Sequence, residues 1–160
     1  THGHADHIAG NGAIKELFPA APLVIGPGDA PKLTDARLNL SATFGFAVTS
    51  PEADRLLDEG DLVDFAGIPL EVLEAPGHSC GHVMFLYRSA PPVVFGGDVL
   101  FAGSVGRTDI PDGNFAQLRA AIEAKLFTLP AGTIVLPGHG ESTTVGRERE
   151  SNPFVGRRGV

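Results

Sequence analysis

Short apolar runs separated by turns that contain glycine or proline make up most of the hydropathy pattern of this chain. Short runs with such boundaries are typical of β-strands. The pattern predicts strands at residues 23–25, 61–65, 68–73, 82–87, 93–95 and 133–136. The second and third of these alternate partly between apolar and polar positions, and we expect them to form a hairpin about Ala66 and Gly67.

Two stretches show helical rather than strand periodicity. Residues 8–18 are expected to form a helix that ends before Pro19. Its candidate buried face consists of Ile8, Ile14, Leu17 and Phe18. Asn114 is a favourable N-cap for a second helix. The apolar stripe of that helix, which we expect to pack in the core, consists of Phe115, Leu118, Ile122 and Leu126.

The remaining segments are less regular. Residues 31–44 and 52–57 contain short helical patches, and residues 141–151 are expected to form a polar helix or turn. Phe44 and Phe46 fit packing in a core or a lid better than the wall of a substrate pocket. Because helices interrupt the strands along the whole chain, the pattern indicates an α+β layered architecture.

Composition narrows the class of protein and of partner. A chain of 160 residues fits one domain with its own core. The formal net charge of -7 argues against nucleic acid or an anionic membrane as a partner. No apolar run is long enough for a transmembrane helix. Cys80 is the only cysteine, so no internal disulfide can form, and we expect a cytoplasmic protein.

The first seven residues carry four side chains that can bind metal ions: His2, His4, Asp6 and His7. His2 and His4 lie two positions apart, so on an extended segment their imidazoles point the same way. A backbone that changes direction at Ala5 would aim both pairs into one pocket, which suits two metal ions better than one. A histidine-rich terminal tag is the alternative, but such tags repeat one residue type.

Three further candidate ligands lie downstream, each where a predicted strand meets a loop that contains glycine. They are His78, Asp98 and His139. Strand ends are rigid, and glycine allows the backbone to crowd a site, so this placement is a way to present ligands from distant parts of a chain. Imidazole and carboxylate ligands together favour zinc, manganese or iron over calcium or magnesium.

The motifs His-x-His-x-Asp-His, Pro-Gly-His, Gly-Asp and Pro-Gly-His, in this order, resemble those of the metallo-β-lactamase-fold hydrolases. Within that family the chain is most similar to the short, single-domain glyoxalase II type, the hydroxyacylglutathione hydrolases. The resemblance implies a four-layer αββα sandwich, with the site at the edge where the two sheets meet. Several strands normally precede the first motif, so we expect residues 1–160 to form a partial domain that lacks its N-terminal strands.

The resemblance also implies a set of ligands and a reaction. One metal ion would be held by His2, His4 and His78 and the other by Asp6, His7 and His139, with Asp98 bridging them. Asp6 and Asp98 are the expected catalytic residues. The ions would be two divalent metals, zinc in the first place, with iron or manganese as alternatives. A bridging hydroxide would attack a small-molecule thioester or ester, and the glutathione conjugate S-lactoylglutathione is the expected example.

Neighbouring residues are expected to have other roles. His82 is expected to be structural and to pack behind the ligands, and the resemblance does not use Cys80 as a ligand. Arg107 and Asp109 are expected to pair and to brace their loop. Contact of Arg107 with a substrate carboxylate is the alternative.

Other functions stay open at this point. The same fold includes glutathione persulfide dioxygenases, which would use one iron held by Asp98, His78 and either His2 or His4. The glycines on both sides of His139 favour the hydrolase. A lactonase is a further option. From a different class, the chain could be a non-catalytic metal-binding domain or an inactive remnant.

Overall fold

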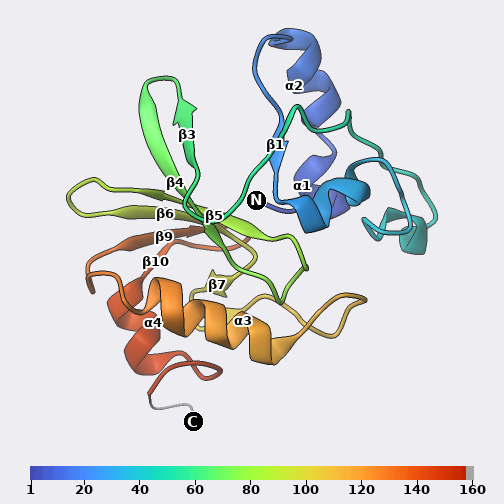
Figure 1. Cartoon of the computed structure of the whole chain (residues 1–160). Helices are drawn as coiled ribbons and strands as arrows, with labels where there is room; N and C mark the ends of the chain where they lie inside the picture. Colours follow the sequence, from blue (N-terminus) through green and yellow to red (C-terminus); the bar gives the residue numbers. More distant parts are fainter. Residues whose placement is uncertain (158–160) are drawn as a thin grey trace.

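One six-stranded sheet forms the centre of the computed structural model, which describes residues 1–157 (Figure 1). The strand order is β10-β9-β6-β5-β4-β3. The bounds are Leu62–Phe65 for β3, Ile68–Glu74 for β4, Val83–Tyr87 for β5, Val93–Gly97 for β6, Ile134–Pro137 for β9 and Thr143–Thr144 for β10. β6 and β9 run parallel, and all other neighbours in this sheet are antiparallel. The predicted strands in this region are confirmed.

The hairpin of β3 and β4 has the predicted two-residue turn. Phe65 pairs with Ile68, and Ala66 and Gly67 between them have φ angles of 53° and 87°. Two positive φ values in succession are typical of the type I′ turn, whose twist matches that of the flanking strands. Asp64 Oδ1 accepts a hydrogen bond from the Gly67 N–H at 2.9 Å, which stabilises the turn.

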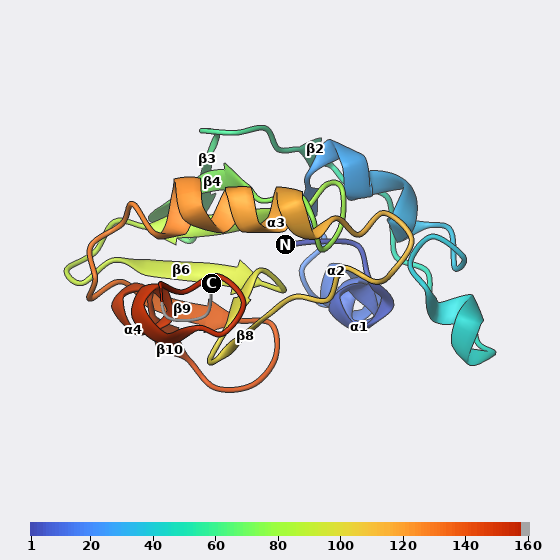
Figure 2. The ribbon, with the colours of Figure 1, turned by 90° about the horizontal axis from the view of Figure 1, so that it is seen from below.

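Two helices cover one face of the sheet (Figure 1, Figure 2). They are α3 (Phe115–Ala121), which continues as a π-helical turn over Ile122–Leu126, and α4 (Val145–Ser151). Asn114 caps α3 as predicted, because its side chain accepts a hydrogen bond from the Gln117 N–H. The helix within 141–151 is also confirmed.

The main core lies between these helices and the sheet. Leu118, Ile122 and Leu126 are fully buried in one cluster with sheet residues that include Met84 and Val94. This confirms three of the four residues in the predicted stripe. Phe115, the fourth, is 40% exposed, because it stands on the first turn of α3 and lies outside the cluster.

The N-terminal third of the chain gathers at one end of the sheet (Figure 2). It contains α1 (Ala5–Ile8), α2 (Asn11–Leu17), the parallel pair β1 (Val24–Ile25) and β2 (Arg55–Leu56), and the 3₁₀ turns η1 (Pro27–Leu33) and η2 (Ser41–Phe44). Ile8, Ile25 and Leu33 form a small core of their own. The predicted strand at 23–25 is therefore confirmed. A last short pair, β7 (Leu100–Phe101) and β8 (Ser104–Val105), follows β6.

The prediction of one helix over residues 8–18 with a buried face was wrong in part. The helix is divided at Ala9 and Gly10 into α1 and α2, and only Ile8 is buried. Ile14, Leu17 and Phe18 are 55%, 71% and 60% exposed. The chain changes direction at this break, and no other element among residues 1–157 buries the apolar side of α2.

Of the other two helical predictions, the one for residues 52–57 was wrong and the one for residues 31–44 was confirmed in part. Residues 52–57 contain the strand β2, because the Leu57 N–H donates to the Ile25 carbonyl and β1 supplies a partner for an extended chain. Residues 31–44 form only parts of two 3₁₀ turns. Pro31 lies inside η1, where a ring without an N–H cannot continue an α-helix.

None of the helices within residues 1–157 is both long enough and apolar enough to cross a bilayer.

Ile122→Ala should lower the free energy of unfolding by about 2–5 kcal/mol, because it removes a fully buried side chain and leaves a cavity. Urea unfolding followed by circular dichroism measures this loss. Phe115→Ala is the matched control on the same helical segment, with a smaller expected loss because the side chain is partly exposed. Equal losses in the two variants would contradict the core assignment.

Candidate metal centre

The first motif presents its side chains from an extended segment that turns into a helix. Thr1 is tied to the sheet, because its carbonyl accepts a hydrogen bond from the Val83 N–H at 2.9 Å. His4 has extended dihedral angles, φ −69° and ψ 151°, and α1 begins at the next residue. Asp6 and His7 lie on the first turn of α1. The predicted change of direction at Ala5 is therefore present.

The other three candidate ligands follow strands, as predicted. His78 follows β4, Asp98 follows β6 and His139 follows β9. A Cβ atom on Gly77 would lie 2.3 Å from the Leu118 nitrogen, so the loop before His78 packs directly on α3. A Cβ atom on Gly138 would lie 2.3 Å from Asp98 Oδ1. Glycine is needed at these two positions because the ligand loops touch their neighbours.

Three buried imidazoles, those of His2, His4 and His78, form the first donor set. His4 Nδ1 lies 3.1 Å from His2 Nε2 and 2.9 Å from His78 Nε2. His78 Nδ1 lies 2.9 Å from the Arg107 carbonyl oxygen, which can only accept, so this nitrogen carries the proton and Nε2 offers a lone pair.

Two rings of the first donor set, those of His2 and His4, are held in their neutral form. Burial, followed by the neighbouring ring of His82, lowers the pKa of His2 far below its ordinary value. Burial, followed by the ring of His78, lowers the pKa of His4 to about 4. Three buried rings that turn nitrogen atoms toward one point match the ligand chemistry of a divalent transition metal.

Asp6, His7 and His139 form the second donor set, which is more exposed. His139 Nε2 lies 3.0 Å from Asp6 Oδ2 and 3.3 Å from His7 Nε2. The side chains of Asp6 and His139 are 58% and 57% exposed, so this set faces solvent.

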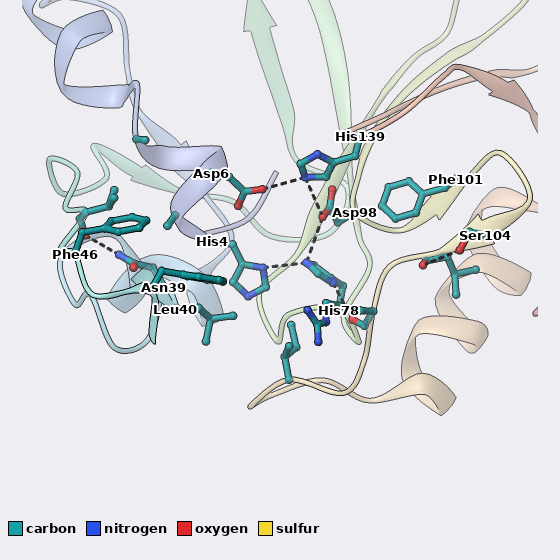
Figure 3. Close-up of a pocket in the computed structure, with 17 residues that line it drawn as sticks. His4, Asp6, Asn39, Leu40, Phe46, His78, Asp98, Phe101, Ser104 and His139 are labelled. Atoms are coloured by element: carbon teal, nitrogen blue, oxygen red, sulfur yellow. Dashed lines mark hydrogen bonds and ion pairs between the residues drawn. The ribbon is translucent and has the colours of Figure 1, made fainter. Parts of the chain in front are cut away.

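Asp98 lies between the two sets (Figure 3). Its Oδ1 atom lies 3.4 Å from His7 Nε2, and its Oδ2 atom lies 3.6 Å from the Nε2 atoms of both His78 and His139. Burial alone would raise the pKa of Asp98, but its contact with His7 and the nearby His78 and His139 hold this pKa below its usual value. The carboxylate is therefore ionised, and its buried Oδ1 has no hydrogen-bond partner among the described residues.

The structure thus brings all seven predicted ligands together, and the donor atoms fit a metal centre. That these side chains bind ions stays a prediction. His82 lies directly behind them: its Nε2 accepts the Asp98 N–H at 3.0 Å, and its ring stacks on His2 with centroids 4.8 Å apart. This arrangement agrees with the structural role expected for His82.

A cavity of about 700 Å³ opens over the two donor sets. Leu40 and Phe46 lie on one side of it and Phe101 on the other (Figure 3). Phe44 also lines the cavity, and its ring stacks on Phe46 with centroids 6.3 Å apart. Phe44 and Phe46 do not pack in a core, since their rings are 73% and 56% exposed, and they line the cavity, which was the less favoured alternative. Neither ring belongs to the described core clusters.

Arg107 also lines the cavity, and it pairs with Asp109 as expected. The two side chains make paired hydrogen bonds of 2.9 and 3.0 Å. Two of the guanidinium nitrogens of Arg107 therefore already donate to a residue of the same loop.

Sequence reasoning missed a group of charged residues next to the centre, namely Asp29, Lys32 and Asp112. They are separated from the ligand motifs by long stretches of chain, and no local pattern connects them to those motifs.

Comparison with known proteins identifies the family. The family model of the metallo-beta-lactamase superfamily matches residues 1–139. The chain belongs to this superfamily and has its fold, a mixed α and β structure as predicted. The superfamily is one of metallo-hydrolases, and its fold implies that the site binds divalent metal ions.

Similar proteins with sequence matches include the "Probable metallo-hydrolase YqgX" of Bacillus subtilis, 40% identical over 97% of this chain and 73% of the relative. The "Hydroxyacylglutathione hydrolase GloC" of Haemophilus influenzae is 36% identical, with the same coverage of 97% and 73%.

Three solved structures are similar to this chain in both fold and sequence. The BLEG-1 B3 metallo-beta-lactamase matches with a TM-score of 0.91 and 38% identity, over 96% of this chain and 74% of that chain. TTHA1623 in a di-iron-bound form matches with a TM-score of 0.83, 38% identity and the same coverage. ETHE1 from Myxococcus xanthus matches with a TM-score of 0.75 and 31% identity, over 97% and 60%.

Addition of Zn²⁺ to metal-free protein should raise the midpoint of thermal unfolding, because an ion that binds only the folded state stabilises it. At a free concentration a thousand times the dissociation constant, the gain is about 4 kcal/mol. Differential scanning calorimetry measures the shift. Mg²⁺ should act weakly, since it prefers oxygen ligands. Identical midpoints with and without Zn²⁺ would contradict the metal centre.

Proposed function

We propose that the chain forms a two-metal hydrolase centre that cleaves a thioester or ester, with S-lactoylglutathione as the first substrate to test. The observation that carries this proposal is the position of Asp98, whose two oxygen atoms each face the nitrogen of at least one candidate ligand. A single carboxylate between two complete donor sets suits a pair of ions better than one ion.

Zinc is the proposed metal, with iron or manganese as alternatives. The first set offers three imidazole nitrogens and the second offers two together with a carboxylate. Such mixed donors are suited to all three metals. The di-iron form of TTHA1623 supports a two-ion centre in a similar structure, although it favours iron in that protein.

When bound, two divalent ions lower the pKa of water and polarise a carbonyl group, which gives hydrolysis at neutral pH. The residues of the chain would orient the reactants and move protons. Asp98 would hold the two sets together. Asp6 lines the cavity and is largely exposed, so its carboxylate would accept the proton of the attacking water.

The walls of the cavity bear on the choice of thioester. The two walls present mainly apolar side chains to a substrate whose carbonyl lies at the centre. Arg107 is the only cationic residue among the lining residues that the structure describes, and it is paired with Asp109. The likeness to GloC supports a glutathione thioester. The walls favour a substrate with an apolar group next to the scissile bond.

A glutathione persulfide dioxygenase is the second candidate. The likeness to ETHE1 favours it, since His4, His78 and Asp98 could hold a single iron. That function would leave Asp6, His7 and His139 without a role, although their donor atoms are gathered at one point. Metal stoichiometry separates the two candidates.

Protein purified without chelators should contain about two equivalents of metal, and His7→Ala should contain about one. Because His7 is a ligand of only one proposed ion, its loss should lower kcat/KM for a thioester by about 100-fold or more. Elemental analysis and a thiol-release assay measure the two effects.

Asp109→Asn serves as the control for His7→Ala, since Asp109 lies near the cavity but belongs to neither donor set. It should keep both ions. One equivalent of iron in the unaltered protein, with oxygen consumption on a persulfide, would favour the dioxygenase. Unchanged turnover in His7→Ala would refute the two-metal hydrolase.

The double substitution Phe44→Ala and Phe46→Ala should lower kcat/KM for a thioester with a long apolar acyl group by about 10-fold or more. A short acetyl thioester should be affected less, because it does not reach this wall. Steady-state kinetics on the matched pair of substrates tests this. Phe154→Ala, another exposed phenylalanine that does not line the cavity, is the control. Equal effects on both substrates would show that the wall does not select the acyl group.

A further inference from the structure

Asp29 is a buried carboxylate outside all of the ligand motifs. It lies on η1, and its side chain is fully buried. A carboxylate in this position needs several donors to compensate for the loss of water. The structure supplies donors from three separate segments of the chain, and two of these segments carry metal-ligand candidates.

One oxygen of Asp29 joins the two segments of the first donor set. Asp29 Oδ2 accepts hydrogen bonds from the Gly3 N–H at 2.7 Å and from the Ser79 hydroxyl at 2.8 Å. Gly3 lies between His2 and His4, and Ser79 directly follows His78. A single atom therefore fixes the distance between the two stretches of backbone that present all three imidazoles.

The other oxygen is held by a buried lysine and by the same loop. Asp29 Oδ1 accepts hydrogen bonds from the Gly81 N–H and from Lys32 Nζ, both at 2.8 Å. Lys32 Nζ also donates to Asp112 Oδ2 at 2.6 Å, and that oxygen accepts the Cys80 N–H at 3.0 Å. The ammonium group thus joins the two carboxylates and holds Asp29 in place.

This cluster could be mistaken for a further metal site. Donor atoms of Asp29, Cys80 and Asp112 lie within 4.8 Å of one another. Lys32 Nζ, however, already lies at hydrogen-bond distance from both carboxylates. The lysine takes the place of a cation, so the cluster is a fixed support and not a place for another ion.

The backbones in this region are in close contact. A Cβ atom on Gly3 would lie 2.6 Å from Lys32 Cβ, and one on Gly81 would lie 2.2 Å from the Asp29 nitrogen. The segments therefore have little freedom to move relative to η1. Hydrogen bonds to an ionised acceptor are roughly twice as strong as those between neutral groups.

We propose that Asp29, braced by Lys32, is the positioning residue of the first donor set and fixes His2, His4 and His78 before an ion binds. The inference rests on the proposed function only in that this set binds a metal ion. None of the hydrogen bonds described for Asp29 involves Asp6, His7 or His139. The loss of Asp29 should therefore lower the affinity for one ion more than the affinity for the other.

The test is Asp29→Asn, in which one acceptor oxygen becomes an NH₂ group that faces donors. It should lower the affinity for one of the two bound Zn²⁺ ions by about 10- to 100-fold, as the loss of a hydrogen-bond partner of a metal ligand does. Competition with a chromophoric chelator measures both affinities. The d–d absorption of the Co²⁺-substituted protein should change for one ion only, which a general loss of stability would not produce.

Asp54→Asn is the matched control. Asp54 Oδ2 accepts the Leu23 N–H at 2.7 Å and lies 2.7 Å from Lys15 Nζ, so it has the same kinds of partner at a place that does not contact the donor sets. It should leave both affinities unchanged. Ser79→Ala is a milder probe, because it removes only one of the several hydrogen bonds to Asp29. It should weaken the same ion by a smaller factor.

Wild-type affinity for both ions in folded Asp29→Asn would overturn the inference, and so would equal weakening of the two. If Asp29→Asn does not fold, Ser79→Ala decides, and unchanged affinities there would overturn it. The readout is independent of turnover. A protein that binds two ions and hydrolyses no thioester would refute the proposed function while leaving the role of Asp29 in place.

Discussion

Seven metal-ligand candidates held at one place are the constraint on which the rest of this structure depends. Lone pairs and carboxylate oxygens that face one another are unfavourable without a cation, so the surrounding fold has to hold them there. The sheet places three of them at strand ends, and α1 provides two more. Burial keeps the rings of His2 and His4 neutral, which is the form that can bind a metal ion.

The two donor sets are held in different ways. The first is enclosed, and the buried network of Asp29 and Lys32 fixes its backbone on the side away from the cavity. The second is exposed on the cavity side, where Asp6 and His139 face solvent. A centre with one rigid half and one accessible half is suited to a reaction in which a substrate approaches from a single direction. The apolar walls then decide what can approach.

Membership of the metallo-beta-lactamase superfamily sets the class of chemistry but not the substrate. The similar proteins include a hydroxyacylglutathione hydrolase and a B3 metallo-beta-lactamase, which are two different activities. In such a superfamily the fold is shared, and the function depends on the site that it carries. Here the site carries a second donor set and a cavity lined by phenylalanine side chains.

The sequence by itself determined the features that depend on near neighbours. The hairpin turn at Ala66 and Gly67, the cap at Asn114 and the spacing of His2 and His4 are local, so the residues alone predicted them. The seven candidate ligands were also recognisable, because four stand together in the first seven residues and three follow predicted strands at loops that contain glycine. The tertiary structure decided what depends on distant partners. Arg55 and Leu56 form a strand because β1 lies beside them, and Ile14 is exposed because no other described element covers it. Asp29 acquired its role through hydrogen bonds to segments 26 and 50 residues away, a separation that no periodicity in a sequence can reveal.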